Sequence, residues 1–404
     1  MNIKNLINEY LGDTELQFIR ILENITKGNE FKVYLVGGLL RDIVLGLKPN
    51  ELDIAVEGDI DLLIKLLSDN CSIIQETEFK TFKLKYMDIF VDIALARKES
   101  YIPKGSLPSI TIASLREDLS RRDFTINALA LEIYPTSSNY MIDPFNAIKD
   151  INDKKIKVIH ADSFKDDPTR IFRAIRFSER LSFALDDETL KLLDQDKNRI
   201  AALTPPRILN EVVKIIDEIY PLPILLKLQK YNIFSHFLPL EKEINVLFEN
   251  NISTISNWDY FILYLSKHID ELTFNESMNR YPISKKTRTF INNAYNLRRI
   301  IKEIKNSSVD RLSIEKFISL EAIIQPSFDA ELCLSSPDEE EIICDLILRL
   351  SHTKVLINTQ DLINLGIQKG KNIGKAFKEL KYKKFQLTLK TKEEEIKYIR
   401  DSFF

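Results

Sequence analysis

The sequence of 404 residues contains no run of 18 apolar residues, so we expect no membrane-spanning helix and no membrane partner. Its three cysteines, Cys71, Cys333 and Cys344, are far apart, which favours reduced thiols and a cytoplasmic protein over a disulfide framework. Its four histidines are scattered and there is no CxxC, which argues against a zinc site. The first residues, MNIKNLINEYLGD, are too polar for a secretory signal peptide.

Glycine is missing between residues 106 and 365, although five glycines lie between Gly37 and Gly105 and three between Gly366 and Gly374. Because glycine is scarce inside helices, this distribution predicts an α+β head, a helical body and a distinct C-terminal segment. The net charge is only −3, so a nucleic-acid partner would have to be held by local basic patches.

The first informative segment is FKVYLVGGLLRDIVLG, which follows an expected amphipathic helix over residues 1–28. It predicts a strand, a tight turn at Gly37 and Gly38, and a helix that begins at once. Free backbone N–H groups and the helix dipole at such a turn suit a triphosphate. On the two glycines alone, a plain strand-to-helix turn is the better explanation, because a Gly-Gly pair is a weak motif.

Acidic residues occur in two of the predicted strands. In ELDIAVEGD, strand alternation places Glu51 and Asp53 on one face, and IFVDIALAR carries Asp92 inside an otherwise apolar run. Neighbouring carboxylates repel each other, so divalent metal binding or a solvated edge is needed to explain them. If the strands are neighbours, the three acids can converge on two magnesium ions that clamp an attacking hydroxyl and a leaving pyrophosphate.

Two arginine-rich segments follow, after a predicted loop that contains Pro103, Gly105 and Pro108. RRDFTINA (121–128) combines arginines suited to phosphate with Asp and Asn suited to ribose hydroxyls, although a salt-bridged exposed turn is an equal alternative. In FKDDPTRIFRAIRF, Asp167 is followed by arginines at three-residue spacing, which largely share one helix face. An anion or base against this row, or a solvated charged face, would explain it.

Residues from 203 to about 350 predict helix after helix, with a basic patch around 285–299 that is as consistent with solvated charge as with RNA. The segment NTQDLINLGIQKGKNIGKAFKEL then predicts a glycine loop that runs into a helix. Residues 361–392 contain nine lysines and two acids, which suits a sequence-independent grip on phosphates. Thr391 and Glu394 predict a capping box for the last helix.

Four of these motifs together resemble the class II tRNA nucleotidyltransferases and poly(A) polymerases of the polymerase-beta-like nucleotidyltransferase superfamily. The family pattern is GGxxRD, DxD, RRDFTxNA and EDPxRxxRAxRF. The chain has GGLLRD (37–42), ELD (51–53), RRDFTINA (121–128) and DDPTRIFRAIRF (166–177) in the same order. The C-terminal glycine segment is similar to the family's DLxxLGxxxGxxIG. The resemblance implies a nucleotidyltransferase head with a small mixed sheet, followed by an all-α neck, body and tail.

The resemblance also implies roles for individual residues. Glu51 and Asp53 would hold Mg²⁺ and, with Asp92, form the catalytic carboxylates. The residues implied in nucleotide binding are Gly37, Gly38, Arg41, Arg122, Asp123, Asn127, Asp167, Arg170, Arg173 and Arg176. The residues implied in tRNA binding are Gly366, Lys369, Gly370, Lys371 and Gly374. The chain departs from the family at Glu51 and Asp166, where the family has Asp and Glu, and at Asn146-Ala147, where it has Gly-Gly.

The implied base-reading pair, Asp167 and Arg170, has a physical rationale. Cytosine and adenine each present an exocyclic amine beside a ring-nitrogen acceptor, so a carboxylate and a guanidinium fit both bases. Uracil and guanine present a carbonyl at the amine position and would leave the carboxylate unpaired, at a cost of about 1–3 kcal/mol. A pair of side chains can therefore replace a nucleic-acid template.

From these observations we expect a catalytic head over residues 1–145, a neck over 146–215, a body over 216–350 and a tRNA-binding tail over 351–404. The expected activity is addition of CMP and AMP to the 3′ end of tRNA from CTP and ATP, with Mg²⁺ and release of pyrophosphate; no protein partner is implied. The alternatives are an A-adding or CC-adding enzyme and a poly(A) polymerase. A tRNA-binding protein whose head is inactive because of Glu51 is the non-enzymatic alternative.

Overall fold

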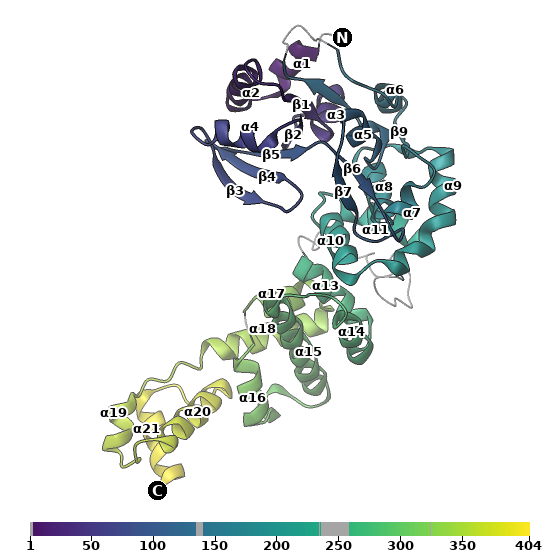
Figure 1. The fold of residues 1–404 in the computed structure, drawn as a ribbon. Helices are drawn as coiled ribbons and strands as arrows, with labels where there is room; N and C mark the ends of the chain where they lie inside the picture. Colours follow the sequence, from purple (N-terminus) through teal and green to yellow (C-terminus); the bar gives the residue numbers. More distant parts are fainter. Residues whose placement is uncertain (1–2, 135–139, 234, 236–257, 324) are drawn as a thin grey trace. The chain divides into compact units, whose positions relative to one another are not determined.

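A computed structural model describes residues 3–134, 140–233, 235, 258–323 and 325–404. It divides into two compact units, residues 1–237 and 238–404. The first unit combines strands and helices and the second is helical (Figure 1). The α+β prediction is therefore confirmed, whereas the finer division into four parts remains a prediction. No helix among the described residues is long and apolar enough to cross a membrane.

A six-stranded mixed sheet forms the centre of the first unit, in the order β3-β4-β5-β2-β1-β8. Strands β2 and β5 are parallel, and the other neighbours are antiparallel. The strands are β1 (Lys32–Val36), β2 (Leu52–Glu57), β3 (Ser72–Glu76), β4 (Thr81–Tyr86), β5 (Ile89–Leu95) and β8 (Ala130–Glu132). Two small pairs stand apart from it: β6 (Arg97–Ser100) with β7 (Ser109–Ile112), and β9 (Lys155–Ile156) with β10 (Ala184–Leu185).

Both faces of the sheet are packed, which explains the apolar alternation in its central strands. Tyr34 and Val36 on one face of β1 join a buried cluster with Leu115 and Leu119. On β4, Tyr86 packs against Phe18 with ring centroids 5.2 Å apart. A strand covered on both sides has to carry apolar residues at successive positions, as β1 and β2 do. This packing fixes the strand ends where the polar motifs begin.

The helices of the first unit surround the sheet and continue beyond it (Figure 1). They are α1 (Ile3–Tyr10), α2 (Asp13–Thr26), α3 (Gly38–Val44), α4 (Ile60–Leu67), α5 (Leu115–Ser120), α6 (Ala147–Asn152), α7 (Ser163–Asp166), α8 (Thr169–Arg180), α9 (Asp187–Asp196), α10 (Pro205–Ile216) and α11 (Pro221–Lys230), with 3₁₀ turns η1 (Thr125–Asn127) and η2 (Lys197–Ala202).

Two local features differ from the sequence-based expectation, and a third explains a departure from the family pattern. The helix predicted over residues 1–28 is two helices, α1 and α2, because Gly12 between them has extended backbone angles. Residues 1 and 2 of the predicted helix lie outside the described residues. The predicted loop after Arg97 is flanked by the β6–β7 pair. At the start of α6, Asn146 adopts the left-handed conformation (φ 60°, ψ 36°). Asparagine tolerates that region better than most residues, which explains how it replaces a glycine there.

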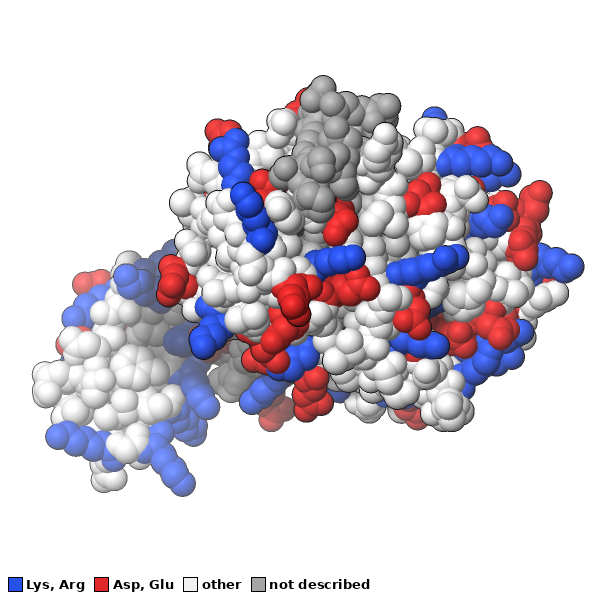
Figure 2. Space-filling model, turned by 45° about the horizontal axis from the view of Figure 1, so that its top comes forward, with Lys and Arg blue, Asp and Glu red and all other residues white. Residues whose placement is uncertain are grey.

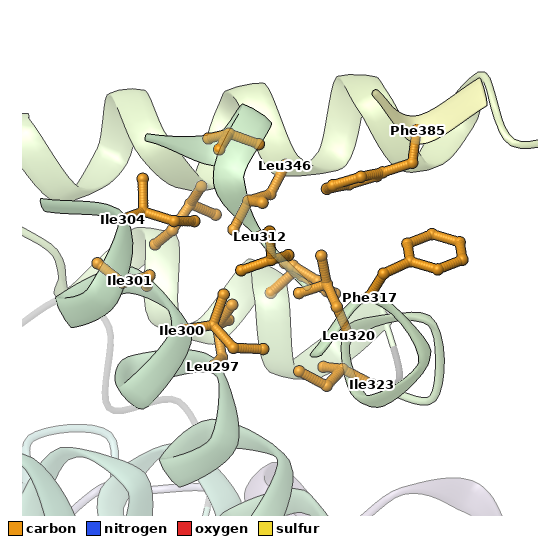
Figure 3. Close-up of a cluster of buried hydrophobic side chains, with 13 residues drawn as sticks. Leu297, Ile300, Ile301, Ile304, Leu312, Phe317, Leu320, Ile323, Leu346 and Phe385 are labelled. Carbon is orange, nitrogen blue, oxygen red and sulfur yellow. The ribbon is translucent and has the colours of Figure 1, made fainter. Parts of the chain in front are cut away.

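The second unit is helical throughout its described residues, as predicted; residues 236–257, which the helical prediction also covers, lie outside them. Its elements are α13 (Trp258–His268), α14 (Glu271–Met278), α15 (Lys285–Asn306), η5 (Val309–Arg311), α16 (Ile314–Glu321), α17 (Gln325–Leu334), α18 (Pro337–Ser351), α19 (Thr359–Asn364), α20 (Lys371–Phe385) and α21 (Lys392–Phe403). Figure 3 shows the buried cluster that joins α15, α16, α18 and α20. Phe317 and Phe385 lie beside each other in it, with ring centroids 5.1 Å apart.

The last three helices have a second, small core that includes Leu362, Leu380 and Ile399. The buried carboxylate of Glu395 holds this core to the preceding segment, because it accepts hydrogen bonds from the backbone N–H groups of Leu356 and Ile357 and from Lys384. The capping box predicted at the start of α21 is confirmed by the Thr391 and Glu394 hydrogen bonds. The tail segment is therefore a packed element rather than an extension.

Candidate active site

A cavity of about 820 Å³ opens beside the sheet, and the arginine-rich motifs and the Gly-Gly turn meet around it. Its lining includes every head and neck residue predicted for the site except Gly37 and Asp92. These residues are Gly38, Arg41, Glu51, Asp53, Arg122, Asp123, Asn127, Asp167, Arg170, Arg173 and Arg176. Motifs separated by more than 100 positions in the sequence thus form one pocket.

The turn between β1 and α3 depends on glycine at its first position. Gly37 has φ 73° and ψ −135°, and a Cβ atom built on it would lie 2.6 Å from Nη1 of Arg122. A side chain at this position would be strained and would displace that arginine. Among the described residues, Nε of Arg122 is buried and finds no hydrogen-bond partner. The turn therefore packs against the guanidinium of Arg122, which lines the pocket.

Asp53 is the central carboxylate of the site. It lies on β2 directly opposite Asp92 of β5, so the predicted neighbourhood of the two strands is confirmed. Burial, followed by the negative charge of Glu51, raises the pKa of Asp53 from 3.8 to about 6, and Asp92 contributes in the same direction. Glu51 and Asp92 thus both act electrostatically on Asp53.

Asp92 does not line the large cavity. Asp92 and Glu51 instead line a smaller cavity of about 310 Å³. The carboxylate of Asp92 lies 3.9 Å from Nζ of Lys83. Over the described part of the chain, no three His, Cys, Asp or Glu side chains are grouped closely enough to form a metal site. The structure therefore brings Glu51 and Asp53 to the large pocket, with Asp92 one strand away.

A chain of hydrogen bonds holds the nucleotide-facing motifs together. Nη1 of Arg41 donates to Asn127 (2.6 Å), and Nδ2 of Asn127 donates to Asp123 (3.0 Å). Asp123 also accepts from Arg173, whose Nη2 lies 2.6 Å away. Burial alone would raise the pKa of Asp123, but Arg173 and Asn127 outweigh burial and lower it to about 2. This network ties α3 and η1 to α8.

Replacing Asp123 by alanine is expected to destabilise the first unit by about 2 kcal/mol, because Arg173 and Asn127 lose their partner. The stabilisation given by this depressed pKa is complete above the ordinary Asp range near pH 4 and is lost as the pH falls towards 2. Urea unfolding at pH 7 and at pH 3 should show a smaller difference between variant and wild type at pH 3. Asp69, an exposed carboxylate, provides the control. If its replacement by alanine lowered the free energy of unfolding as much as that of Asp123, this account would be contradicted.

The predicted base-reading residues lie at the start of α8. Oδ1 of Asp167 accepts from the Thr169 backbone N–H and from Nη2 of Arg207, at 3.0 and 2.7 Å. Arg170 is 4 % exposed and donates to Ser163 and to the Arg121 carbonyl. These contacts fix both side chains in place along one wall of the pocket. Asp166, the residue before them, does not line the pocket and lies 3.5 Å from Lys104.

Sequence reasoning missed several pocket residues. They are Glu99, Tyr101, Phe177, Arg180, Glu211 and Lys214. Glu211 and Lys214 lie on α10, and a Glu–Lys pair three residues apart is typical of any exposed helix. Only the near-complete burial of Glu211 distinguishes this pair from a surface pair. Phe177 is close to three guanidiniums, those of Arg41, Arg173 and Arg176, whose Cζ atoms lie 5.0–5.5 Å from its ring centre.

Basic and acidic side chains are mixed over the face drawn in Figure 2, in keeping with the small net charge. Two arginines of the basic patch on α15 form ion pairs within the chain: Arg298 pairs with the buried Glu331, and Arg299 pairs with Glu271 at the surface. In the tail, the predicted tRNA-binding residues all lie exposed between the end of α19 and the first turn of α20. They are Gly366, Lys369, Gly370, Lys371 and Gly374.

Comparison with known proteins extends these observations. Residues 33–157 match the family described as the poly A polymerase head domain. Residues 182–244 match a second family, described as the probable RNA and SrmB-binding site of polymerase A. The first match contains the Gly-Gly turn, the three carboxylates and the RRDFTINA motif.

Individual relatives are similar over part or all of the chain. An A-adding tRNA nucleotidyltransferase of Geobacter sulfurreducens is 33% identical over 280 residues, which is 66% of this chain and 31% of that protein. The chain thus spans about a third of that relative. The A-adding tRNA nucleotidyltransferase of Halalkalibacterium halodurans is 26% identical over 100% of this chain and 96% of its own length.

Solved structures of similar proteins cover the whole chain. A CCA-adding enzyme in complex with ATP superimposes with a TM-score of 0.77 at 26% identity, over 100% of this chain and 99% of that one. The Thermotoga maritima CCA-adding enzyme complexed with tRNA superimposes with a TM-score of 0.74 at 26% identity, with the same coverage.

Proposed function

Because this chain belongs to the tRNA nucleotidyltransferase and poly(A) polymerase family, we propose that it adds CMP and AMP to the 3′ end of tRNA, using CTP and ATP and releasing pyrophosphate. One observation carries the proposal: a single pocket joins the carboxylates of β2, the arginines of RRDFTINA and the Asp167–Arg170 pair. The acids suit phosphoryl chemistry, and the pair suits the amine edge shared by cytosine and adenine.

The carboxylates fit a magnesium ion. Their oxygens are the ligands that Mg²⁺ prefers, and the raised pKa of Asp53 marks a cluster of negative charge that a cation would relieve. Glu51 and Asp53 would hold the ion, with Asp92 in the neighbouring strand. When bound, Mg²⁺ neutralises charge on the reacting phosphates and activates the attacking hydroxyl. Glu51 carries one methylene more than the family's Asp, which Mg²⁺ tolerates less readily.

The remaining residues bind and orient the nucleotide. Arg122 lines the pocket beside the Gly37–Gly38 turn and is placed to contact phosphate. Arg41 and Asn127 hold the ribose side of the pocket in place through their hydrogen bond. Asp167 and Arg170 select the base, and Arg207 keeps Asp167 in position. A site of this kind accelerates the reaction mainly by positioning and by charge stabilisation.

The tail is proposed to grip the tRNA backbone at the start of α20. A Cβ atom built on Gly374 meets nothing within 4 Å, although glycine inside a helix is unfavourable. We therefore expect Gly374→Ala to stabilise the tail by about 0.5–1 kcal/mol and yet to weaken tRNA binding severalfold. Thermal melting and a filter-binding titration measure the two effects.

Gly370 provides the matched comparison, because its φ of 112° disfavours any side chain. Gly370→Ala should weaken tRNA binding and also lower stability. If Gly374→Ala raises stability and leaves the affinity for tRNA unchanged, the tail does not use this surface.

The proposed activity is tested with three tRNAs that end before the first C, after one C and after CC, each incubated with Mg²⁺ and one labelled nucleotide. We expect CMP on the first two and AMP on the third. The names of the two relatives favour a second candidate, an A-adding enzyme, which would label only the tRNA that ends in CC. No label on any tRNA would leave a tRNA-binding protein with an inactive head.

A further inference from the structure

The face of the sheet that carries Asp53 continues outward across β5 and β4. In the register of the strands, Asp53 on β2 lies opposite Asp92 on β5, and Asp92 lies opposite Lys83 on β4. Side chains at paired positions point to the same face, so these three form one row across the sheet. The side chains of Asp92 and Lys83 are 36% and 41% exposed. The row therefore leads from the large pocket to an accessible surface on the β4 side of the sheet (Figure 1).

A second row on the same face carries an exposed aromatic ring. Phe90 on β5 lies opposite Lys85 on β4, and it shares a face with Asp92 because it is two residues earlier in the strand. Phe90 is 51% exposed, and Nζ of Lys83 lies 5.7 Å from the centre of its ring. An exposed ring beside lysines is typical of surfaces that bind single-stranded nucleic acid, because bases stack on the ring and phosphates pair with the cations.

The cavity of about 310 Å³ joins this surface to the proposed site of chemistry. Its lining includes Lys83 and Phe90, and it shares Glu51 with the large pocket. Glu15 and Asp88 also line it, so a phosphate in this cavity has to lie near a lysine. In phosphoryl transfer the attacking and leaving oxygens are roughly in line, so the two substrates approach the acids from different sides. With the incoming nucleotide in the large pocket, the smaller cavity is left for the end of the strand that is extended.

We propose that this face of the sheet binds the 3′-terminal nucleotide of the RNA primer, with its base stacked on Phe90 and its phosphate beside Lys83. The inference rests on the proposed function and assigns a place to the second substrate of that reaction. Stacking is tolerant of sequence, since every base has a π face. Such a site suits an enzyme whose primer ends in a different nucleotide after each addition.

The first test removes the ring. Phe90→Ala should raise the KM for a tRNA that ends in CC about tenfold and leave the KM for ATP unchanged. Phe90→Trp, which keeps a stacking surface, should remain close to wild type. Phe79 is a similarly exposed ring, at 47%, and it lines neither cavity, so Phe79→Ala should keep the wild-type values.

A tRNA whose last nucleotide lacks its base identifies what the ring contacts. The wild-type protein should extend this abasic end about tenfold less efficiently than the intact end. Phe90→Ala has already lost the stacking contact, so its kcat/KM values for the two ends should agree within about twofold. An aromatic ring with a purely structural role would leave the two proteins equally sensitive to the missing base.

Lys83 is tested by the salt dependence of tRNA binding, because its replacement also changes the surroundings of Asp92. Lys83→Gln should reduce the slope of log Kd against log salt concentration by about 0.7, the value for one phosphate contact on a single strand. Lys80 is the matched control: its side chain is also 41% exposed, and it pairs with Asp61. Lys80→Gln should leave the slope unchanged.

A tRNA that ends in 2-aminopurine riboside reports stacking without catalysis. Its fluorescence should fall when the wild-type protein binds, and the change should be about half or less with Phe90→Ala. The inference is overturned by equal fluorescence changes in the two proteins, by equal losses on the abasic end, or by a Lys83→Gln slope equal to that of wild type. If the wild-type protein extends no tRNA but shows the expected fluorescence change, the proposed function fails and the placement of the 3′ end stands.

Discussion

Replacing Asp53 by asparagine should slow nucleotide addition by at least about a thousandfold, which corresponds to roughly 4 kcal/mol of lost transition-state stabilisation. The same variant should be more stable than wild type in metal-free buffer at pH 7. Asp53 is ionised there against burial and against Glu51, with its pKa raised to about 6. The neutral amide avoids that penalty, which we place at about 1–3 kcal/mol.

The sign of the pH dependence follows from the raised pKa. Between about pH 4 and pH 6 the folded protein binds a proton that the unfolded chain has released, so wild-type stability falls as the pH rises through this range. The advantage of Asp53→Asn in a thermal melt should therefore disappear as the pH is lowered from 7 to 4. Added Mg²⁺ should stabilise wild type and have little effect on the variant.

A fully active Asp53→Asn variant would remove this residue from the catalytic site. Glu51→Asp is the companion experiment, because it restores the acid that the family pattern has at this position. A faster enzyme would identify the longer side chain of Glu51 as a limit on catalysis.

Replacing Asp167 by asparagine should change which bases are accepted. An amide N–H₂ in place of a carboxylate oxygen faces the amine of cytosine or adenine with another donor, so CMP and AMP addition should fall about tenfold to a hundredfold. UMP and GMP addition should rise relative to them, because these bases present a carbonyl at that position. The four nucleotides are compared on one tRNA by their kcat/KM values.

Asp166 is the matched control for this experiment. It carries the same side chain one residue earlier and is within salt-bridge distance of Lys104 without lining the pocket. Asp166→Asn should therefore keep the order of nucleotide preference. If Asp167→Asn lowers all four rates equally, Asp167 supports the start of α8 through its bond to Thr169 and does not read the base.

The fold was predictable where a short pattern determines local structure. The apolar alternation around Asp53 and Asp92 indicated two strands. Because these strands are neighbours in the sheet, the prediction that the two acids lie close together is confirmed. The β6–β7 pair was missed because Pro103 and Gly105 dominate that stretch, and a pair of four-residue strands leaves little periodicity. The break at Gly12 was visible as a glycine, but the apolar spacing continues across it.

The pocket was predictable for residues within compact motifs and not for those contributed by packing. Glu211 and Lys214 lie on a helix that has the pattern of an ordinary amphipathic surface element, and only the docking of α10 on α8 brings them to the pocket. Arg207 on the same helix reaches Asp167 for the same reason. The orientation of Asp92 depends on Lys83 of the adjacent strand, a contact that pairing register creates. Such contacts arise from tertiary structure and leave no local signal.

The most direct test uses one purified protein, Mg²⁺, and a mixture of CTP and ATP with a tRNA that lacks its last three nucleotides. Sequencing the 3′ ends of the products reads the order and number of added nucleotides without a template. The account predicts ends that read CCA and stop there. Runs of A, or a tRNA extended only when CC is already present, would contradict CCA addition, and unextended tRNA would contradict the enzyme.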